Sequence, residues 1–567
     1  MMAKLLHTVS SAFRLFPDTQ EAEVAAAQLD RATMLRNDTF SFQILFRSPG
    51  KSHWSPLSVS VFCDGIPLTA YRVDYVNVTE TANFYGQAGF VRSTPGLFPS
   101  PLHPRKSASK LRGTGTNLVY EVGEKTHLAS NGSYSALWVT VNPDGTLLTP
   151  GKKTVKIALF ELEKGTHLES AGFEIKVLEP VLQDQSLYYT NWFHVDCLCD
   201  YYGVKPYSQK FYRYFRSFLE NMVRHRQNTI LMPAITPALD TVVGGRRRNV
   251  QLVDVEKTEN GYRFGFERLR KFIQVCRDAG IRYFEHPPLF SQWGAKQAVT
   301  VYDLHGKQLF GWDTDAVDPE YTLFLNSYLR QLLMLEKEVG HTGDFIFHIS
   351  DEPRHDGLAN YKMAADSVRE VLSGHMVVDA LKDVEFYRQG VVRTPVVFIA
   401  YAEDFVGVCP DFWLYYTGGL NRNEIASRLI SVDSARTRVL GLQLWYYGAK
   451  GFLHWGYNYC YNYMSNGFFD PISNPCGYKN YPGASFLAYY TPKGAIPSIG
   501  EKLMGEAMDD VRALQTLESR VGRQAVLALC ESVLGKPVSN VLVPGEQDLV
   551  KLRFAINEAI SAEETVC

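Results

Sequence analysis

The 567-residue chain lacks the features that mark several large classes of protein. Cysteine is scarce, with 9 residues and no CxxC pair, which argues against a disulfide-rich secreted domain. No apolar run is long enough to span a bilayer, and Met1–Thr8 lacks the apolar core of a secretion signal. The formal net charge of -2 offers no basic surplus to attract nucleic acid. These absences predict a cytoplasmic protein with no membrane or nucleic-acid partner.

Signatures of several common enzyme classes are also missing. There is no GxSxG, no P-loop and no GxGxxG in a suitable context, which removes the commonest hydrolase and nucleotide-binding interpretations. His194 and Asp196 have a spacing found in metalloenzymes, but no second cluster completes a set of metal ligands. The sequence therefore predicts neither a metal ion nor a cofactor.

Aromatic residues are abundant, in contrast, and reach 13% of the chain with Tyr 32, Phe 33 and Trp 8. Many of them cluster in the second half beside the ends of predicted strands. Aromatic faces stack on the apolar faces of sugar rings, although large cores also use aromatics. This composition favours a carbohydrate ligand.

Residues 1–182 are predicted to form an all-β domain. The segments 39–46, 57–62 and 135–141 show period-two or continuously apolar patterns typical of strands, and Asn142–Gly145 has the composition of a turn. Short strands at this spacing predict a β-sandwich. An interruption at 83–118, rich in Gly, Pro, Ser and Lys, is longer than an ordinary connection and predicts a solvated excursion or a functional loop.

From about residue 185 strands and helices alternate, which predicts a distorted (β/α)8 barrel over residues 183–518. A small C-terminal appendage is expected at 519–567. The predicted strands are 187–195, 229–235, 281–286, 344–350, 375–381, 395–401, 412–417 and 450–457. The predicted helices are 208–225, 266–279, 320–339, 357–373, 382–389, 423–440 and 499–518.

The fourth predicted strand runs directly into two adjacent carboxylates, Asp351 and Glu352, followed by Pro353. The C-terminal ends of barrel strands are where active sites assemble. Charge at the end of a buried strand costs free energy unless it has a partner or a purpose. The alternative is that the pair caps the helix predicted from Gly357 or lies solvated in a loop.

Other predicted strand ends carry the side chains that a sugar pocket requires, since carboxylates handle protons, tryptophans form a floor and polar groups bind hydroxyls. The candidate substrate-binding residues are Trp192, His194, Asp240, Gln292, Trp293, Asp379, Tyr416, Trp455, Tyr457 and Asn458.

Five separated motifs then point to a family: Trp192–Cys197, Gln251–Val255, Phe290–Lys296, His348–Pro353 and Lys450–Asn458. Together they resemble the family called domain of unknown function 4091. Its catalytic domain is similar to that of glycoside hydrolase family 123, the β-N-acetylgalactosaminidases. The resemblance covers roughly 185–520, and an N-terminal sandwich fits it.

The resemblance implies catalysis assisted by the substrate, with retention of the anomeric configuration. In that mechanism the sugar's 2-acetamido carbonyl attacks the anomeric carbon and forms an oxazolinium ion. Glu352 would be the general acid and then the base, and Asp351 would hold the acetamido N–H. A neighbouring carboxylate raises the pKa of an acid, which suits this pair. Consecutive residues of an ideal strand point to opposite faces, so the strand must bend here.

The leading expectation is thus a retaining exo-β-N-acetylhexosaminidase with N-acetylgalactosamine favoured. One alternative is a glycosidase for a sugar without an acetamido group, with Asp240, Glu285 or Asp379 as nucleophile. Another is a non-catalytic carbohydrate-binding protein. The sequence leaves the oligomeric state open, a homodimer among the options.

Overall fold

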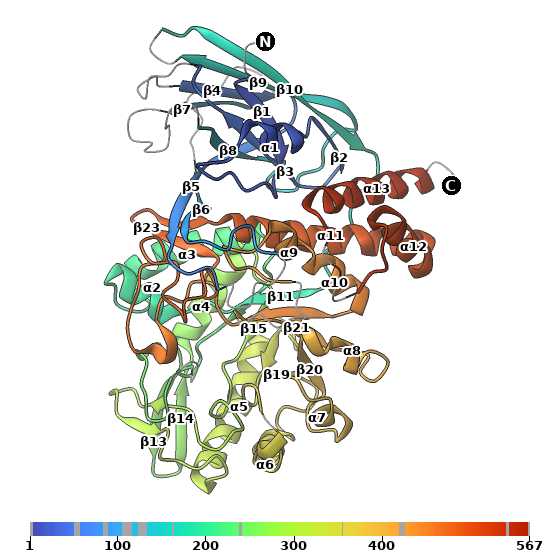
Figure 1. Cartoon of the computed structure of the whole chain (residues 1–567). Helices are drawn as coiled ribbons and strands as arrows, with labels where there is room; N and C mark the ends of the chain where they lie inside the picture. Colours follow the sequence, from blue (N-terminus) through green and yellow to red (C-terminus); the bar gives the residue numbers. More distant parts are fainter. Residues whose placement is uncertain are drawn as a thin grey trace. The chain divides into compact units, whose positions relative to one another are not determined.

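The structure is a computed structural model that describes residues 4–49, 57–82, 89–104, 116–122, 133–161, 164–237, 241–353, 355–418, 426–539, 542 and 544–564 (Figure 1). Its contacts divide the chain into two compact units. Unit 1 consists of Met1–Gln185, Ile425–Tyr446 and Ile496–Cys567, and unit 2 of Ser186–Glu424 and Tyr447–Ala495. The expected boundary at 182/183 is close to this division, but two segments that were expected to belong to the barrel group with the N-terminal region instead.

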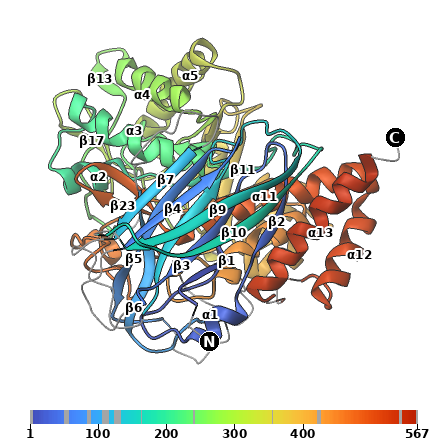
Figure 2. The same cartoon turned by 90° about the horizontal axis from the view of Figure 1, so that it is seen from above.

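Unit 1 contains two five-stranded sheets, whose strands are seen together in Figure 2. The first has the order β1–β3–β8–β5–β6, formed by Leu6–Ser10, Phe40–Phe46, Ser135–Val141, Leu68–Val78 and Gly96–Pro104. The second has the order β2–β10–β9–β4–β7, formed by Arg31–Leu35, His167–Leu178, Gly151–Glu161, Leu57–Cys63 and Thr116–Val122. Neighbouring strands are antiparallel except β2 and β10, which run parallel. A short helix, α1 (Glu21–Ala26), follows β1.

Residues of both sheets share one hydrophobic core. In β4 the side chains of Val59 and Val61 are fully buried, whereas Ser60 between them is partly exposed, as the pleat of a half-buried strand requires. Phe42 of β3 stacks on Phe173 of β10 with ring centroids 4.2 Å apart. The apolar side chains of the two sheets therefore form one core, and their burial stabilises the packing of the sheets.

The strands predicted at 39–46, 57–62 and 135–141 are confirmed as β3, β4 and β8. The predicted turn is present too, since the N–H of Gly145 donates to the carbonyl of Asn142 at 3.0 Å. The interruption predicted at 83–118 contains strand β6 and the start of β7. The rest of it lies largely outside the described residues.

Unit 2 is built on a closed barrel of eight parallel strands, which confirms the predicted barrel at the eight predicted positions. The strands in order are β11 (Tyr188–Asn191), β12 (Thr229–Leu231), β15 (Tyr283–Glu285), β18 (Phe345–Phe347), β19 (Met376–Leu381), β20 (Thr394–Phe398), β21 (Trp413–Tyr415) and β22 (Gly451–His454). Three small hairpins are inserted: β13–β14 (Asp254–Thr258, Gly261–Gly265), β16–β17 (Val301–Tyr302, Gln308–Phe310) and β23–β24 (Ala488–Thr491, Gly494–Pro497).

Two of the helices between the barrel strands show clear signals at their ends. The carboxylate of Asp318 caps the start of the longest of them, accepting the N–H groups of Glu320 and Tyr321, and Gly280 ends another with φ +110°. These helices are α2 (Val195–Tyr202), α3 (Gln209–Arg224), α4 (Glu267–Ala279), α5 (Pro319–Val339), α6 (Leu358–Val368), α7 (Glu385–Arg388) and α8 (Ala402–Phe405), with 3-10 turns η1 (His355–Gly357), η2 (Ile399–Tyr401) and η3 (Tyr463–Ser465).

The helix predicted at 423–440 is wrong in position. Residues 426–433 are not helical, and two short helices follow, α9 (Ser434–Arg438) and α10 (Leu440–Tyr447). The side chain of Asp433 accepts the N–H of Ala435 at 2.8 Å, so the helix begins at this cap rather than upstream.

The C-terminal part of unit 1 is helical, with α11 (Ile499–Val521), α12 (Arg523–Leu534) and α13 (Glu546–Glu564), drawn in red in Figure 1. The helix predicted at 499–518 is confirmed as α11. Helix α13 contacts α11, α12 and β2. Over the described residues, no helix combines the length and the apolarity needed to cross a bilayer.

A buried charge network joins these helices to the β region within unit 1. The guanidinium of Arg553 in α13 donates to Asp38 at 2.7 Å and to Asp510 at 2.8 Å. Asp510 also accepts from Arg438 at 2.8 Å, and Arg438 donates to Glu506 at 2.9 Å. Because buried charges are tolerated only when they are paired, this network ties three segments that are far apart in the chain.

Replacement of Arg553 by Met should destabilise unit 1 by about 3 to 5 kcal/mol, because Asp38 and Asp510 lose a buried cationic partner. Lys551→Met is the matched control, since Lys551 on the same helix forms an exposed ion pair with Asp548 that contributes at most about 1 kcal/mol. Thermal unfolding of the two variants measures the difference. Equal effects would contradict the importance of the network.

Candidate active site

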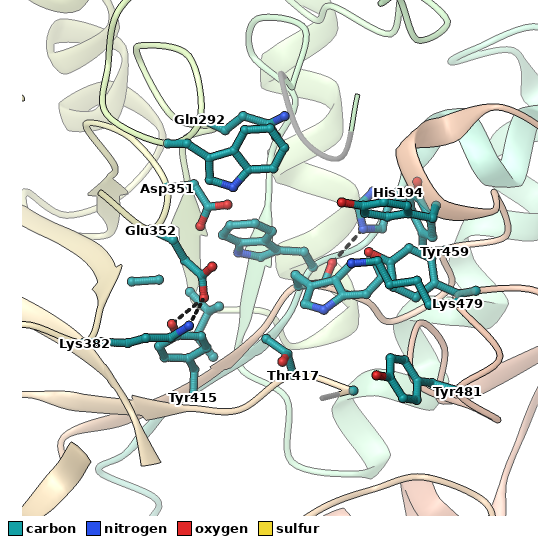
Figure 3. Close-up of a pocket in the computed structure, with 18 of the residues that line it drawn as sticks. His194, Gln292, Asp351, Glu352, Lys382, Tyr415, Thr417, Tyr459, Lys479 and Tyr481 are labelled. Atoms are coloured by element: carbon teal, nitrogen blue, oxygen red, sulfur yellow. Dashed lines mark hydrogen bonds and ion pairs between the residues drawn. The ribbon is translucent and has the colours of Figure 1, made fainter. Parts of the chain in front are cut away.

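A cavity of about 430 Å³ opens where the barrel strands end, and all the residues that line it belong to unit 2 (Figure 3). This is the face on which barrel enzymes assemble their sites. The lining residues are Trp192, His194, Arg247, Gln292, Trp293, Asp351, Glu352, Ala380, Lys382, Tyr415, Thr417, Gly418, Leu453, Trp455, Tyr459, Tyr463, Tyr478, Lys479 and Tyr481.

The segment after β18 brings both predicted catalytic carboxylates to this cavity. Strand β18 ends at Phe347, before residue 350, where the sequence placed its end. Glu352 adopts a left-handed backbone conformation with φ +39°, and the carbonyl of Asp351 accepts the N–H of Trp293 at 2.8 Å. Adjacent residues of a regular strand would face opposite ways, so this bend allows both carboxylates to line one cavity. Such strained conformations persist only where the surroundings hold them.

The carboxylate of Glu352 is held by two neighbours. The hydroxyl of Tyr415, the last residue of β21, donates to Oε1 at 2.6 Å. The Nζ atom of Lys382, which follows β19, lies 3.7 Å from the same oxygen. Both contacts are drawn as dashed lines in Figure 3. They orient the carboxyl group and leave Oε2 without a hydrogen bond from any described residue.

Asp351 holds a proton more tightly than an ordinary carboxyl group. Its pKa is raised to about 7, chiefly because the cavity wall deprives it of hydration, and the charges of Glu352 and Asp379 add to the effect. The positive charges of His348 and Lys382 lower the pKa of Asp351 and so oppose this effect. The sequence predicted like-charge repulsion within the pair; for Asp351 this repulsion adds to the larger effect of burial.

A buried ion cluster lies behind the pair. Nε2 of His348 is 3.0 Å from Oε2 of Glu285, and its Nδ1 is 3.6 Å from Oδ1 of Asp379. Burial disfavours a charged imidazole, but the two carboxylates outweigh burial and raise the pKa of His348 to about 9. His348 is therefore an imidazolium at neutral pH.

The two carboxylates of this cluster also fix the walls of the cavity. Asp379 accepts the N–H groups of Ile349 and Ser350 at 3.1 and 3.3 Å and the hydroxyl of Tyr361, so it anchors the backbone that leads to Asp351 and Glu352. Glu285 accepts the indole N–H of Trp192 at 2.7 Å and thereby positions a ring that lines the cavity.

A second polar cluster lies around Arg247, whose guanidinium forms two 2.7 Å hydrogen bonds with Asp196. It also lies 3.0 Å from Nδ1 of His194, while Nε2 of His194 lies 2.7 Å from the carbonyl of Trp455. Burial, together with the charge of Arg247, lowers the pKa of His194 to about 3, so this imidazole is neutral. Nδ1 then accepts from Arg247, and Nε2–H donates to the carbonyl of Trp455, so both ring nitrogens are engaged. Within the described ranges, no group of three or more His, Cys, Asp or Glu is arranged to hold a metal ion.

One side of the cavity is an aromatic wall, defined here as Trp455, Tyr459, Tyr463 and Tyr478. Trp455 lies 4.7 Å from Tyr478 and 5.1 Å from Tyr459, centroid to centroid, and Tyr463 lies 6.2 Å from Tyr478. Trp293, which is 39% exposed, also lines the cavity. The candidate tryptophans Trp293 and Trp455 therefore both line the cavity, together with tyrosines that were not among the sequence candidates.

The structure brings most of the predicted site residues together, but not all of them. The lining residues among them are Asp351, Glu352, Trp192, His194, Gln292, Trp293 and Trp455. Four other predicted site residues are buried and do not line the cavity: Asp379, Tyr416, Tyr457 and Asn458. Asn458, for example, accepts the backbone N–H of His194 at 2.7 Å and so supports a lining residue. Asp240 lies outside the described residues.

Several lining residues were not among the sequence candidates. Lys382 had a usable signal, because it follows a predicted strand end directly. Arg247 and the tyrosines of the aromatic wall come from long loops in which no periodic pattern marks a position. Their place in the cavity depends on how these loops fold back over the barrel.

The family described as "Glycoside hydrolase 123, catalytic domain" matches residues 192–517, more than half of the chain. The chain belongs to glycoside hydrolase family 123. It is therefore a glycoside hydrolase, and the matched segment of this family 123 chain contains every lining residue of the cavity. The resemblance to family 123 is thus confirmed, while membership of domain of unknown function 4091 stays a prediction.

A solved structure of family 123 has the same fold as this chain. The family 123 chain is similar to a family 123 glycoside hydrolase from Clostridium perfringens, described in connection with glycolipid glycan hydrolysis, with 14% identity and a TM-score of 0.67 over 99% of this chain and 98% of that chain. A family 39 glycoside hydrolase from Bacteroides cellulosilyticus WH2 matches with 9% identity and a TM-score of 0.33 over 87% and 82%. No curated protein matches the chain in sequence.

The raised pKa of His348 makes the stability of the enzyme depend on pH. A group whose pKa rises from 6.5 to about 9 on folding stabilises the fold fully below about pH 6.5, and this contribution is lost as the pH rises through about 9. The loss should amount to about 3 kcal/mol. Denaturant unfolding between pH 6 and 9.5 should show this decline in the wild type and not in His348→Gln.

The matched control for this experiment is His305→Gln, because His305 is exposed in the same unit. In this variant the free energy of unfolding should decline with rising pH as it does in the wild type. If His348→Gln does not fold, Glu285→Gln serves instead and should shift the decline to lower pH. A wild-type stability that stays flat from pH 6.5 to 9 would contradict a charged His348.

Proposed function

We propose that the chain is a retaining glycoside hydrolase for β-linked N-acetylhexosamine, with N-acetylgalactosamine favoured, that uses the substrate's own acetamido group as nucleophile. One observation carries the proposal. Among the described residues that line the cavity, the carboxylates are Asp351 and Glu352, which are adjacent in the chain. The sugar preference rests on the resemblance of the motifs to β-N-acetylgalactosaminidases.

A protein nucleophile would need a different arrangement. A retaining enzyme of that kind places a second carboxylate about 5 to 5.5 Å from the acid, on the opposite side of the scissile bond. The alternative nucleophiles Glu285 and Asp379 are fully buried and are held by Trp192, His348 and backbone N–H groups. Neither lines the cavity, which favours an internal nucleophile from the substrate.

The contacts of Glu352 suit a general acid and base. Oε1 is held by Tyr415 and Lys382, so Oε2 can face the glycosidic oxygen. In the first step Glu352 would donate its proton to that oxygen as the anomeric C–O bond breaks, while the acetamido carbonyl oxygen forms a new bond to the anomeric carbon. In the second step Glu352 would take a proton from water, which attacks the anomeric carbon and opens the oxazolinium ring.

Asp351 suits the role of holding the acetamido group. Its raised pKa means that Asp351 holds a proton up to near neutral pH when the cavity is empty. An acetamido N–H that donates to Asp351 would favour its charged form, because hydrogen bonds to a carboxylate lower its pKa. Substrate binding would therefore place a negative charge on Asp351. The negative charge of Asp351 would stabilise the positive oxazolinium ring.

The second candidate is a glycosidase for a sugar without an acetamido group. Of its three proposed nucleophiles, only Asp240 has not been placed away from the cavity. Asp240 lies outside the described residues, so the geometry neither favours nor disfavours it. Family membership favours an enzyme over the third candidate, a non-catalytic binding protein.

Paired aryl β-glycosides distinguish the two enzymatic candidates. The 2-acetamido glycosides of the galacto and gluco series should be hydrolysed and their 2-hydroxy analogues should not, because only the acetamido sugars carry the internal nucleophile. A thiazoline mimic of the oxazolinium ion should inhibit competitively. Turnover of a 2-hydroxy glycoside at a comparable rate would overturn the substrate-assisted mechanism, although the chain would still be a glycoside hydrolase.

Glu352→Gln should lower kcat/KM by about 10²- to 10⁴-fold for a glycoside with a poor leaving group, and by much less for an activated aryl glycoside. The reason is that an activated leaving group departs without a proton. Asp356→Asn, at an exposed acidic residue nearby, is the matched control and should leave kcat/KM unchanged. An equal loss of kcat/KM for both leaving groups would show that Glu352 is not the acid.

A further inference from the structure

The aromatic wall carries a lysine that the proposed mechanism does not use. Lys479 lines the cavity, and its Nζ atom lies 3.6 Å from the ring centroid of Tyr463 and 5.8 Å from that of Tyr478. In Figure 3 Lys479 lies across the cavity from Glu352. An ammonium group over an aromatic face is held by electrostatic attraction, so the rings position this charge at the edge of the cavity.

Two of the three described cationic side chains that line the cavity have an anionic partner. Arg247 is neutralised by Asp196 through two hydrogen bonds, and Lys382 is paired with Glu352. In the described part of the chain, no carboxylate forms an ion pair with Lys479. The wall on which it lies otherwise presents aromatic rings and hydroxyl groups. Its ammonium group thus packs on two tyrosine rings, has no anionic partner among the described residues, and lies across the cavity from Glu352.

We propose that Lys479 recognises an anionic substituent, such as a sulfate ester, on the N-acetylhexosamine bound in the cavity. This inference rests on the proposed function and adds a substrate class to it. The anion would sit on a ring carbon remote from the scissile bond, because Lys479 and Glu352 lie on opposite sides of the cavity. The sugar ring would pack on the aromatic wall, and the ammonium group would donate to the anion.

An ordinary solvated lysine is the alternative. Lys479 is exposed, and its packing on two tyrosines would be stabilising without any ligand. A packing role and an anion-binding role for Lys479 predict different effects of a substitution on hydrolysis. Loss of a packing residue changes the hydrolysis of all substrates alike, whereas loss of an anion-binding residue affects only substrates that carry the anion.

The test compares three aryl 2-acetamido-2-deoxy-β-galactosides: the unsubstituted sugar, its 4-sulfate and its 6-sulfate. The wild type should hydrolyse one of the sulfated glycosides with a higher kcat/KM than the neutral one. Lys479→Gln should lower kcat/KM for that sulfated glycoside by about 10-fold or more while leaving the neutral glycoside nearly unchanged. Lys479→Arg should keep most of the preference because it keeps the charge.

Lys493→Gln is the matched control, since it removes an exposed lysine of the same unit that does not line the cavity. It should change none of the three rates. Added salt should reduce the preference for the sulfated glycoside in the wild type, because an exposed ion pair is screened. A wild type that prefers the neutral sugar, or a Lys479→Gln variant that loses activity equally on all three, would overturn the proposal.

Failure of the proposed function would look different from failure of this inference. If the neutral glycoside is hydrolysed without any sulfate preference, the function stands and the inference falls. If none of the three is hydrolysed, the inference is tested by binding instead. Calorimetry then measures the affinities of the wild type and of Lys479→Gln for N-acetylgalactosamine and its 4- and 6-sulfates. Tighter binding of a sulfated sugar that is lost in Lys479→Gln supports the inference, and equal binding of all three sugars overturns it.

Discussion

The imidazolium of His348 between the buried carboxylates of Glu285 and Asp379 is the interaction on which the site depends. Three ionisable groups in a barrel core are tolerated only because each has a partner of opposite charge or a hydrogen bond. Asp379 also accepts hydrogen bonds from the backbone N–H groups of Ile349 and Ser350, just before Asp351 and Glu352. The cluster therefore holds the bent segment after β18 in place, and its charges add smaller contributions to the pKa of Asp351 than burial and Glu352 do.

The cavity divides into two walls of different chemistry. On one side, Asp351, Glu352, Lys382 and Tyr415 bring together groups that hold or move a proton. On the other, rings from the loop after β22 offer a broad apolar surface with hydroxyl groups at its edge. A sugar has polar edges and apolar faces, so such a cavity fits the ring on one wall and its reacting bond on the other. Family 123 membership and this geometry point to the same class of chemistry.

Local patterns were enough to predict much of the fold. Each barrel strand is a short apolar run bounded by turn residues, and the pair Asp351–Glu352 could be found because charge at the end of such a run is costly. The helix expected at 423–440 shows the limit of the method. A favourable pattern upstream did not produce a helix, since the cap at Asp433 sets where the helix starts. Asp379 illustrates another limit: a strand-end carboxylate can serve the backbone rather than the substrate.

By itself the sequence determined the order of the elements, the barrel and the position of the adjacent carboxylates Asp351 and Glu352 after a barrel strand, because these follow from periodicity and from the cost of burying charge. Only the tertiary structure decided which long-loop residues reach the cavity, among them Arg247, Tyr459 and Lys479. It also decided that His348 is charged and that His194 is neutral. The physical reason is that burial and neighbouring charges set a protonation state, and the neighbours come from strands and loops distant in the chain.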